Sequence, residues 1–442
     1  MVSRQQKPLS LRRNFSWTFV GNVVYAACQW GMLVVLAKLG SPEMVGQFTL
    51  GLAVTAPVIL FTNLQLRAVQ VTDAKQQYVF GDYLGLRLLA TGLALAIIVA
   101  ITLIAGYRWE TSLVILVVGL AKAIESISDV FYGLIQQHER MDRIAISLMI
   151  KGPLSLLFLA LGVYLTGSVL WGAVGLAFAW IIVLIGYDIG SGALMLKNQP
   201  LTPQGEVDRE LVLVKAKIQP RWHLKTLRKL VWLCLPLGFV MMLISLNTNI
   251  PRYFIEHYLG ERELGIFAAT TYLMAATGIV VNALGQSASP RLAKYYASGN
   301  NHAFRTLLLK LVGIGALIGI AGILVATITG KDILYFMYRP EYAKYADLLV
   351  WVMVATAISD IASFLGYGMS AARYFRIQMP IFILVTATSA TSCFWLIPIY
   401  GLQGAAIALI IAAIVEASFS LGVIIHALHR LNRHCENKHD FS

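Results

Sequence analysis

The chain has 442 residues, of which 58% are hydrophobic and 13% are charged, and its mean hydropathy is +0.71. Soluble domains carry about a quarter of charged residues, so this composition excludes an ordinary water-soluble protein. A formal net charge of +13 would suggest nucleic acid as the partner of a soluble chain. In a membrane protein it reflects basic loops on one side, and we expect no nucleic-acid partner.

Apolar segments of roughly 20 residues, each long enough to cross a hydrocarbon core of about 30 Å as a helix, recur along the whole chain. They predict an all-α integral membrane protein with about twelve transmembrane helices. The first six expected spans lie near residues 15–37, 45–66, 84–105, 112–134, 144–166 and 169–195. After a long polar segment, the other six lie near residues 229–250, 264–287, 306–329, 347–370, 377–397 and 402–426.

This layout predicts two six-helix bundles at 1–195 and 229–427, a cytoplasmic linker at 196–228 and a cytoplasmic tail at 428–442. Most of the 35 Lys and Arg residues fall in alternate connections, which places both termini in the cytoplasm. Within the linker, 205–228 alternates apolar with basic residues. That pattern favours a helix on the inner leaflet, and a solvated linker is the alternative.

The two predicted bundles contain short segments of similar sequence. LGSPEMVGQF at 39–48 is similar to LGERELGIF at 259–267, and WGAVGLAFA at 171–179 is similar to YGLQGAAIA at 400–408. We infer an internal duplication, which is the common construction of transporters whose halves move around a central site. Small-residue patterns that recur in any helical membrane protein are the alternative explanation.

The segment YGLIQQHERMDRIAIS at 132–147, the first part of the chain and the twelve-span layout resemble Wzx-type polysaccharide transporters. These O-antigen flippases belong to the multidrug/oligosaccharidyl-lipid/polysaccharide (MOP) exporter superfamily. The resemblance implies a V-shaped pair of bundles in the bacterial inner (cytoplasmic) membrane. It also implies alternating access, and as substrate an undecaprenyl-pyrophosphate-linked oligosaccharide for O-antigen, lipopolysaccharide, capsule or exopolysaccharide. The implied partners are membrane lipids, a polysaccharide polymerase and a chain-length regulator.

Polar side chains within the expected spans are the candidate binding residues, because an anionic headgroup and its sugars need a polar path through hydrocarbon. Aligning the halves pairs Gln29 with Asn249 and Asn63 with Asn282, amides that either line a cavity or only hold the helices together. The candidate amides are Gln29, Asn63, Gln65, Asn249, Asn282 and Gln286. Arg67, at the end of the second expected span, is either a bidentate ligand for phosphate or an ordinary positive-inside anchor.

Lys122 is the only Lys or Arg that we place deep within a span, on a helix with Glu125 and Asp129. Spacings of three and four residues put the three side chains on one face, which we expect to line a cavity. Either Lys122 and Glu125 neutralise each other for packing, or Lys122 meets the pyrophosphate while Glu125 or Asp129 takes up a proton. Asp360, placed in the tenth span much as Asp129 is in the fourth, is a further candidate for coupling.

Other function classes fit less well. Polysaccharide polymerases and ligases need a large outer loop or a catalytic histidine loop, whereas the outer connections are short and His426 is the only histidine in a span. We therefore expect no enzyme, and a small-molecule or drug antiporter of the same fold is the main alternative. The histidine-rich tail fits no compact zinc pattern, so we expect no metal site and no cofactor.

Overall fold

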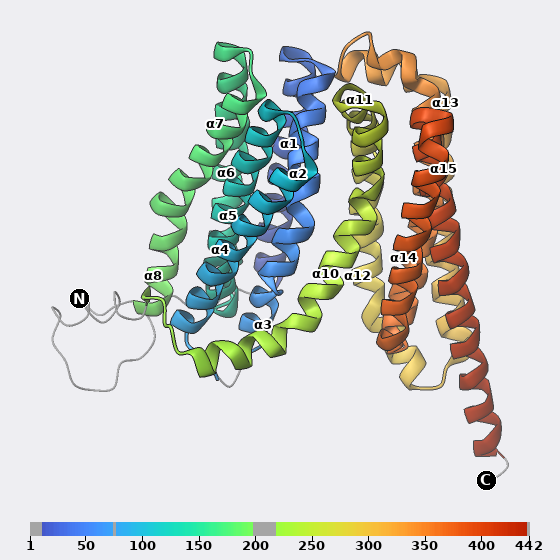
Figure 1. The fold of residues 1–442 in the computed structure, drawn as a ribbon. Helices are drawn as coiled ribbons and strands as arrows, with labels where there is room; N and C mark the ends of the chain where they lie inside the picture. Colours follow the sequence, from blue (N-terminus) through green and yellow to red (C-terminus); the bar gives the residue numbers. More distant parts are fainter. Residues whose placement is uncertain (1–10, 74–76, 198–217, 440–442) are drawn as a thin grey trace, which may run out of the picture. The chain divides into compact units, whose positions relative to one another are not determined.

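The structure, a computed structural model, describes residues 11–73, 77–197 and 218–439. Every regular element in these ranges is a helix, as predicted (Figure 1). The chain divides into two compact units, Met1–Ser245 and Leu246–Ser442. The predicted inner-leaflet helix lies outside the described residues over 205–217.

The first unit contains most of the short elements. In chain order its helices are α1 (Leu11–Leu39), α2 (Pro42–Asn63), α3 (Leu66–Thr72), α4 (Phe80–Ala105), α5 (Trp109–Gln137), α6 (Met141–Thr166), α7 (Val169–Val183), the π-helical turn η1 (Leu184–Asp188) and α8 (Ile189–Lys197). The boundary between the units falls within α10 (Leu224–Leu259). The second unit continues with α11 (Glu261–Tyr272), α12 (Ala275–Ala297), α13 (Asn301–Met337), the 3₁₀ turn η2 (Tyr342–Tyr345), α14 (Ala346–Ala371) and α15 (Phe375–His439).

The described helices account for the twelve predicted spans. Nine spans are long and apolar enough to cross a membrane, and α11 with α12, bent by 45°, is a candidate for a tenth. α5 is long enough but carries Lys122, Glu125 and Asp129 in its middle. The apolar stretch Ile377–Arg430 of α15 has 54 residues and breaks at Gly401, where φ is 59°, so it supplies two crossings. Gly401 lies between the predicted spans 377–397 and 402–426.

Local chemistry sets several helix ends. Ser41 caps α2 by accepting a hydrogen bond from the Met44 amide, and Pro42 occupies the first helical position, where its missing N–H costs no hydrogen bond. Gly106 and Gly167 end α4 and α6 in the left-handed conformation that glycine adopts without strain. These caps keep the connections between spans short.

The second span breaks at two residues that are not glycine. Leu64 and Gln65 separate α2 from α3 with φ values of 53° and 51°, a conformation that side chains with a Cβ rarely adopt. Gly238 of α10 packs directly against the break, because a Cβ at that position would lie 2.7 Å from the Phe61 carbonyl oxygen. The break turns Arg67, on α3, toward α5.

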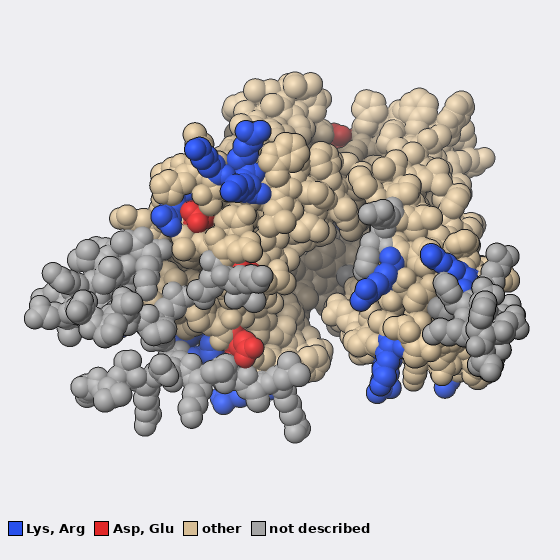
Figure 2. All heavy atoms as spheres, turned by 90° about the horizontal axis from the view of Figure 1, so that it is seen from below, with Lys and Arg blue, Asp and Glu red and all other residues tan. Residues whose placement is uncertain are grey.

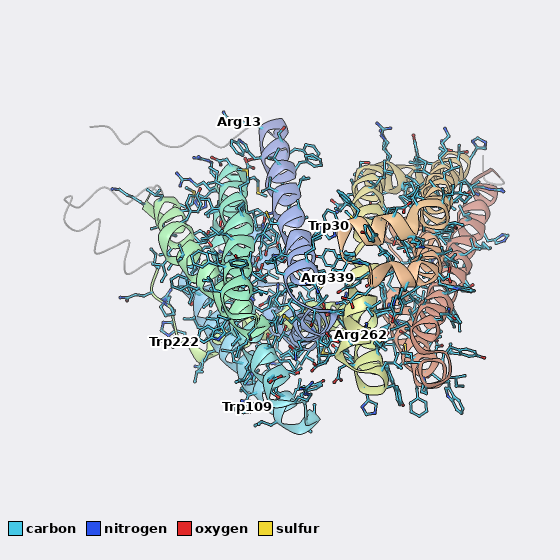
Figure 3. The ribbon with its side chains drawn as sticks, turned by 90° about the horizontal axis from the view of Figure 1, so that it is seen from above. Arg13, Trp30, Trp109, Trp222, Arg262 and Arg339 are labelled. Carbon is cyan, nitrogen blue, oxygen red and sulfur yellow. The ribbon has the colours of Figure 1, made fainter. Side chains whose placement is uncertain are left out.

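Exposed tryptophans mark the two ends of α4. Trp109 follows its C-terminal end and is 75% exposed, while Trp222, 53% exposed, adjoins Arg221, whose amide donates to the Gly81 carbonyl near its N-terminal end. Both project outward in the view from above (Figure 3). Tryptophans at the two levels of a membrane interface are typical of a transmembrane protein.

α5 is the central helix of the first unit, and its position decides where the polar residues lie. It packs against α2, α3, α4, α7 and α8, while α1 packs on α6 and α6 on α7. In the second unit, α12, α13, α14 and α15 pack around a core that includes Phe304 and Phe364, both fully buried. The charged middle of α5 is therefore enclosed by other helices of its own unit rather than by lipid.

Candidate functional site

A cavity of about 900 Å³ lies among α1, α2, α3, α5 and α6 of the first unit. Polar side chains form much of its wall: Thr18, Asn22, Tyr25, Asn63, Gln65, Arg67, Thr72, Lys122, Glu125, Ser126, Asp129, Tyr132 and Gln136. Six of the predicted candidates are therefore brought together around one cavity within the first unit. Their roles as binding or coupling groups stay predictions.

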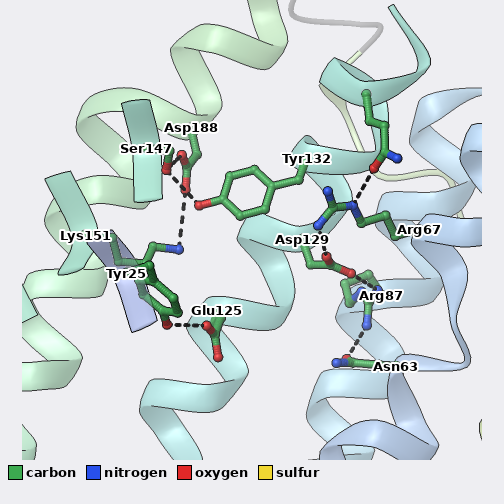
Figure 4. A network of polar contacts seen from close by, with 11 residues as sticks. Tyr25, Asn63, Arg67, Arg87, Glu125, Asp129, Tyr132, Ser147, Lys151 and Asp188 are labelled. Carbon is green, nitrogen blue, oxygen red and sulfur yellow. Dashed lines mark hydrogen bonds and ion pairs between the residues drawn. The ribbon is translucent and has the colours of Figure 1, made fainter. Parts of the chain in front are cut away.

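Asp129 of α5 joins two guanidinium groups at this cavity (Figure 4). Its Oδ1 lies 3.3 Å from Nη1 of Arg67, and its Oδ2 lies 3.2 Å from Nη2 of Arg87. Arg87, on α4, is 0% exposed and also donates to the Asn63 side-chain oxygen, whereas Arg67 is 30% exposed. Nε of Arg67 donates to the Gln136 side chain at 2.9 Å. One carboxylate thus balances two cations, and the local charge is positive.

Lys122 and Glu125 form the second charged pair of the cavity. Nζ of Lys122 lies 2.8 Å from Oε2 of Glu125, and the Tyr25 hydroxyl donates to Oε1 at 2.8 Å. Nζ of Lys122 also lies 5.0 Å from the ring centre of the buried Trp180, a cation–π distance. The predicted common face of Lys122, Glu125 and Asp129 is present, since all three line the cavity. Glu125 nevertheless pairs with Lys122, whereas Asp129 pairs with the two arginines.

The assignment of Lys122 as the only deeply placed cation is wrong. Lys151 of α6 and Arg87 of α4 are both 0% exposed, and Lys151 pairs with Asp188 of η1 at 3.9 Å. A signal for Lys151 existed in the sequence, because it falls two turns inside the expected span 144–166. Arg87 lies near the start of its span, where positive-inside anchors are common, so the sequence does not predict that it is buried.

The segment that carries the family resemblance builds much of this site. Within 132–147, Tyr132 and Gln136 line the cavity, and Ser147 donates to Asp188 behind it. A bidentate salt bridge holds the connection between α5 and α6. Nε of Arg140 donates to Oδ1 of Asp142 at 2.9 Å, and its Nη2 donates to Oδ2 at 2.8 Å. This bond raises the pKa of Arg140 and keeps the guanidinium charged. The motif therefore fixes the end of α5 next to the cavity.

The remaining candidates lie elsewhere. Gln29 is half-buried on α1, one turn from Tyr25, and is not among the residues that line the cavity. In the second unit, Asn249 accepts a hydrogen bond from Arg252 at 2.9 Å, and Asn282 accepts one from the Tyr367 hydroxyl at 3.0 Å. These bonds satisfy the two amide oxygens within their own unit.

Two more candidates of the second unit differ in burial. Gln286 is exposed, one helical turn from Asn282 on α12. Asp360 of α14 is 5% exposed, and its Oδ2 has no hydrogen-bond partner among the described residues. A buried carboxylate oxygen of this kind is costly, which keeps Asp360 a candidate for coupling.

Lys and Arg side chains are present at the surface of both units. Figure 2 shows the chain from below, with several Lys and Arg residues on both units and few acidic residues beside them. The sequence predicts basic residues on the cytoplasmic side, since positive residues remain in the cytoplasm, and the orientation of the chain stays a prediction.

Comparisons with known proteins bear on the whole chain. The sequence model of the family described as polysaccharide biosynthesis protein matches residues 11–296, and that of the MatE family matches residues 236–395. The capsular polysaccharide biosynthesis protein CapF of Staphylococcus aureus is 28% identical over 405 residues, which are 91% of this chain and 96% of that protein.

Two solved structures share the fold. An inward-facing multidrug resistance MATE family transporter of the MOP superfamily has a TM-score of 0.65 at 15% identity, over 94% of this chain and 99% of that one. The lipid II flippase MurJ, in an inward closed conformation, also has a TM-score of 0.65, at 12% identity over 94% and 89% of the chains. The predicted membrane fold is confirmed.

Proposed function

Because this chain belongs to the polysaccharide biosynthesis protein family of the MOP superfamily, a family of transporters rather than enzymes, we propose that it is a flippase for lipid-linked oligosaccharides. The proposed substrate is a sugar repeat unit on a polyprenyl pyrophosphate, and the proposed movement is from the cytoplasmic to the outer leaflet. Both termini then lie in the cytoplasm. A relative named for capsular polysaccharide biosynthesis supports a surface polysaccharide as the end product.

The observation that carries this proposal is the sharing of Asp129 between two arginines. Arg87 is fully buried and needs the carboxylate permanently, because an uncompensated buried charge is costly. Arg67 is partly exposed at the cavity and can exchange Asp129 for another anion. A guanidinium holds phosphate oxygens at two points, so Arg67 is the proposed ligand of the pyrophosphate.

The rest of the cavity wall suits the sugars and the second phosphate. Lys122 supplies another cation, while Asn22, Asn63 and Gln65 offer amide donors and acceptors. No covalent bond is made or broken in such a movement. The cavity only has to replace water around a charged and hydroxyl-rich headgroup on its way through hydrocarbon.

The proposal is tested in cells by measuring in which leaflet the lipid-linked oligosaccharide lies. Deleting the gene should make the lipid-linked oligosaccharide accumulate on the cytoplasmic leaflet and remove the surface polysaccharide. Restoration with wild-type protein should reverse both effects, and Arg67→Ala should not. Arg108→Ala, which removes an exposed arginine outside the cavity, is the matched control and should restore both. Loss of polysaccharide with a normal leaflet distribution would point to a polymerase or ligase instead.

A drug antiporter is the second candidate, and one observation favours it: the cavity also contains Glu125 and Asp129, which are able to bind an organic cation. Both carboxylates already hold cations of the protein itself. Growth in toxic cationic dyes separates the candidates, because only loss of an antiporter should make cells more sensitive while leaving the surface polysaccharide intact.

A further inference from the structure

Behind the cavity wall lies an ion pair that the proposed function does not use. Lys151 of α6 and Asp188 of η1 are fully buried, with Nζ and Oδ2 3.9 Å apart. Neither of these two atoms has a hydrogen-bond partner among the described residues. A buried ion pair stabilises a fold only when good geometry and further hydrogen bonds compensate for the lost water. The two paired atoms are 3.9 Å apart and form no hydrogen bond, so the pair itself contributes little to stability.

The backbone at Asp188 is also unusual. Asp188 ends the π-helical turn Leu184–Asp188, a rare form that occurs mostly at functional sites. Its Oδ1 accepts a hydrogen bond from the Ser147 hydroxyl at 2.5 Å, and Ser147 lies 2.7 Å from the Tyr132 hydroxyl. A serine hydroxyl has one proton, so Tyr132 donates to Ser147. One carboxylate oxygen of Asp188 is thus satisfied, and the other is open.

Two aromatic rings connect this pair to the cavity. Nζ of Lys151 lies 5.1 Å from the ring centre of Tyr132 and 5.8 Å from that of Trp180. The same rings contact the two cations of the cavity, Arg67 at 5.6 Å from Tyr132 and Lys122 at 5.0 Å from Trp180. Figure 4 shows Tyr132 between Arg67 and Lys151. A change of charge at the Lys151–Asp188 pair therefore changes the electrostatic potential at both Arg67 and Lys122.

We propose that Lys151 and Asp188 form a proton-binding site that sets the affinity of the cavity for anions. The inference rests on the proposed function, because the anion is the phosphate of the substrate. Oδ2 of Asp188 takes a proton from hydronium, forming an O–H bond and releasing water, while Lys151 remains an ammonium. The site gains one positive charge, so an anion at Arg67 binds more tightly. By linkage, a bound anion favours uptake of the proton to the same extent.

The other titratable groups around the pair do not replace Asp188 in this role. α5 contributes Glu125, which already pairs with Lys122, and Tyr132. η1 contributes Tyr187, and Tyr25 of α1 donates to Glu125. Tyrosines change charge only in alkaline solution. Asp188 is the carboxylate of this group whose second oxygen is open.

The test uses purified full-length protein and geranyl pyrophosphate as the probe. Its affinity is measured from about pH 8 to about pH 5 for wild type and for Lys151→Met/Asp188→Asn, whose neutral pair avoids an isolated buried charge. The titration of the probe itself cancels in the ratio of the two affinities. We expect that ratio to rise about fivefold in favour of wild type as the pH falls. Glu416→Gln, which removes a carboxylate from the second unit, should keep the wild-type profile. A ratio that does not change with pH overturns the inference.

A second measurement decides the inference if the probe binds neither protein, a result that would count against the proposed function. Infrared difference spectra of the unliganded protein between the two ends of the pH range report protonation of buried carboxyl groups. Wild type should show a protonated carboxyl band at low pH that Asp188→Asn lacks. Identical spectra for the two proteins would mean that Asp188 binds no proton.

Discussion

The carboxylate of Asp129 lies 3.2 Å from the guanidinium of Arg87, a side chain that is completely buried among the helices of the first unit. The bond crosses from α5 to α4, so it fixes the helix that carries the charged face of the cavity. Arg67 binds the other oxygen of the same carboxylate. Asp129 therefore both neutralises the buried Arg87 and holds the proposed phosphate ligand Arg67.

Removing that carboxylate should destabilise the protein. Asp129→Asn leaves Arg87 buried without a counter-charge, which we expect to cost about 3 kcal/mol or more. Thermal unfolding in detergent should show a clearly lower Tm for this variant, whereas Glu110→Gln, at an exposed carboxylate of the same helix, should match wild type. Arg87→Met combined with Asp129→Asn should recover most of the loss, and a double variant no more stable than Asp129→Asn would contradict the ion-pair explanation.

Neutralising the other cavity pair separates packing from binding. Lys122→Met with Glu125→Gln removes the attraction and the desolvation cost together, so the protein should insert and fold normally. If the pair binds substrate, this variant fails to restore surface polysaccharide, while Lys122→Arg keeps partial activity. Full activity of the double variant at matched protein levels would show that the pair serves packing alone.

The break between α2 and α3 should depend on the absence of a side chain at Gly238. A Cβ there would lie 2.7 Å from the Phe61 carbonyl oxygen and 3.0 Å from Cδ2 of Leu64. We expect Gly238→Ala to lower stability by about 1–3 kcal/mol and to weaken transport, because the position of Arg67 follows from the break. Gly92→Ala, where nothing lies within 4 Å, should be as stable as wild type or more so. Equal Tm values for the two variants would argue against this packing.

The orientation of the chain is accessible to reporter fusions. Fusions after residues 140 and 298 should report the cytoplasm, and fusions after residues 108 and 336 should report the outer side, because positive connections stay inside. A cytoplasmic readout after residue 108 would refute the predicted topology.

The sequence predicts the spans well because long apolar runs mark most of them. It places Asn63, Gln65, Arg67, Lys122, Glu125 and Asp129 on helices that share a cavity, since intramembrane polar groups avoid lipid. It does not predict their partners. In the sequence, Arg87 looks like an ordinary positive-inside residue at the end of a span. Asp188, the partner of Lys151, lies in a π-helical turn, which no residue pattern in the sequence predicts.

The break at Leu64 and Gln65 is likewise invisible in the sequence, because neither residue is Gly or Pro. Gly238 of α10 packs against the break, a tertiary contact that the local sequence does not predict. The predicted amide pairs show the limit of reasoning from duplication. Asn63 binds Arg87 at the cavity, whereas its counterpart Asn282 binds Tyr367, so matched positions in the two halves carry different contacts.

The most direct test of the account is a reconstituted assay. Purified protein in lipid vesicles is given a labelled polyprenyl-pyrophosphate oligosaccharide, and the fraction of label in each leaflet is followed with time. We predict that wild-type protein and Arg108→Ala move the label between leaflets, while Arg67→Ala inserts equally well but moves it at least about tenfold more slowly. Movement by Arg67→Ala at the wild-type rate, or no movement by the wild-type protein, would contradict the account.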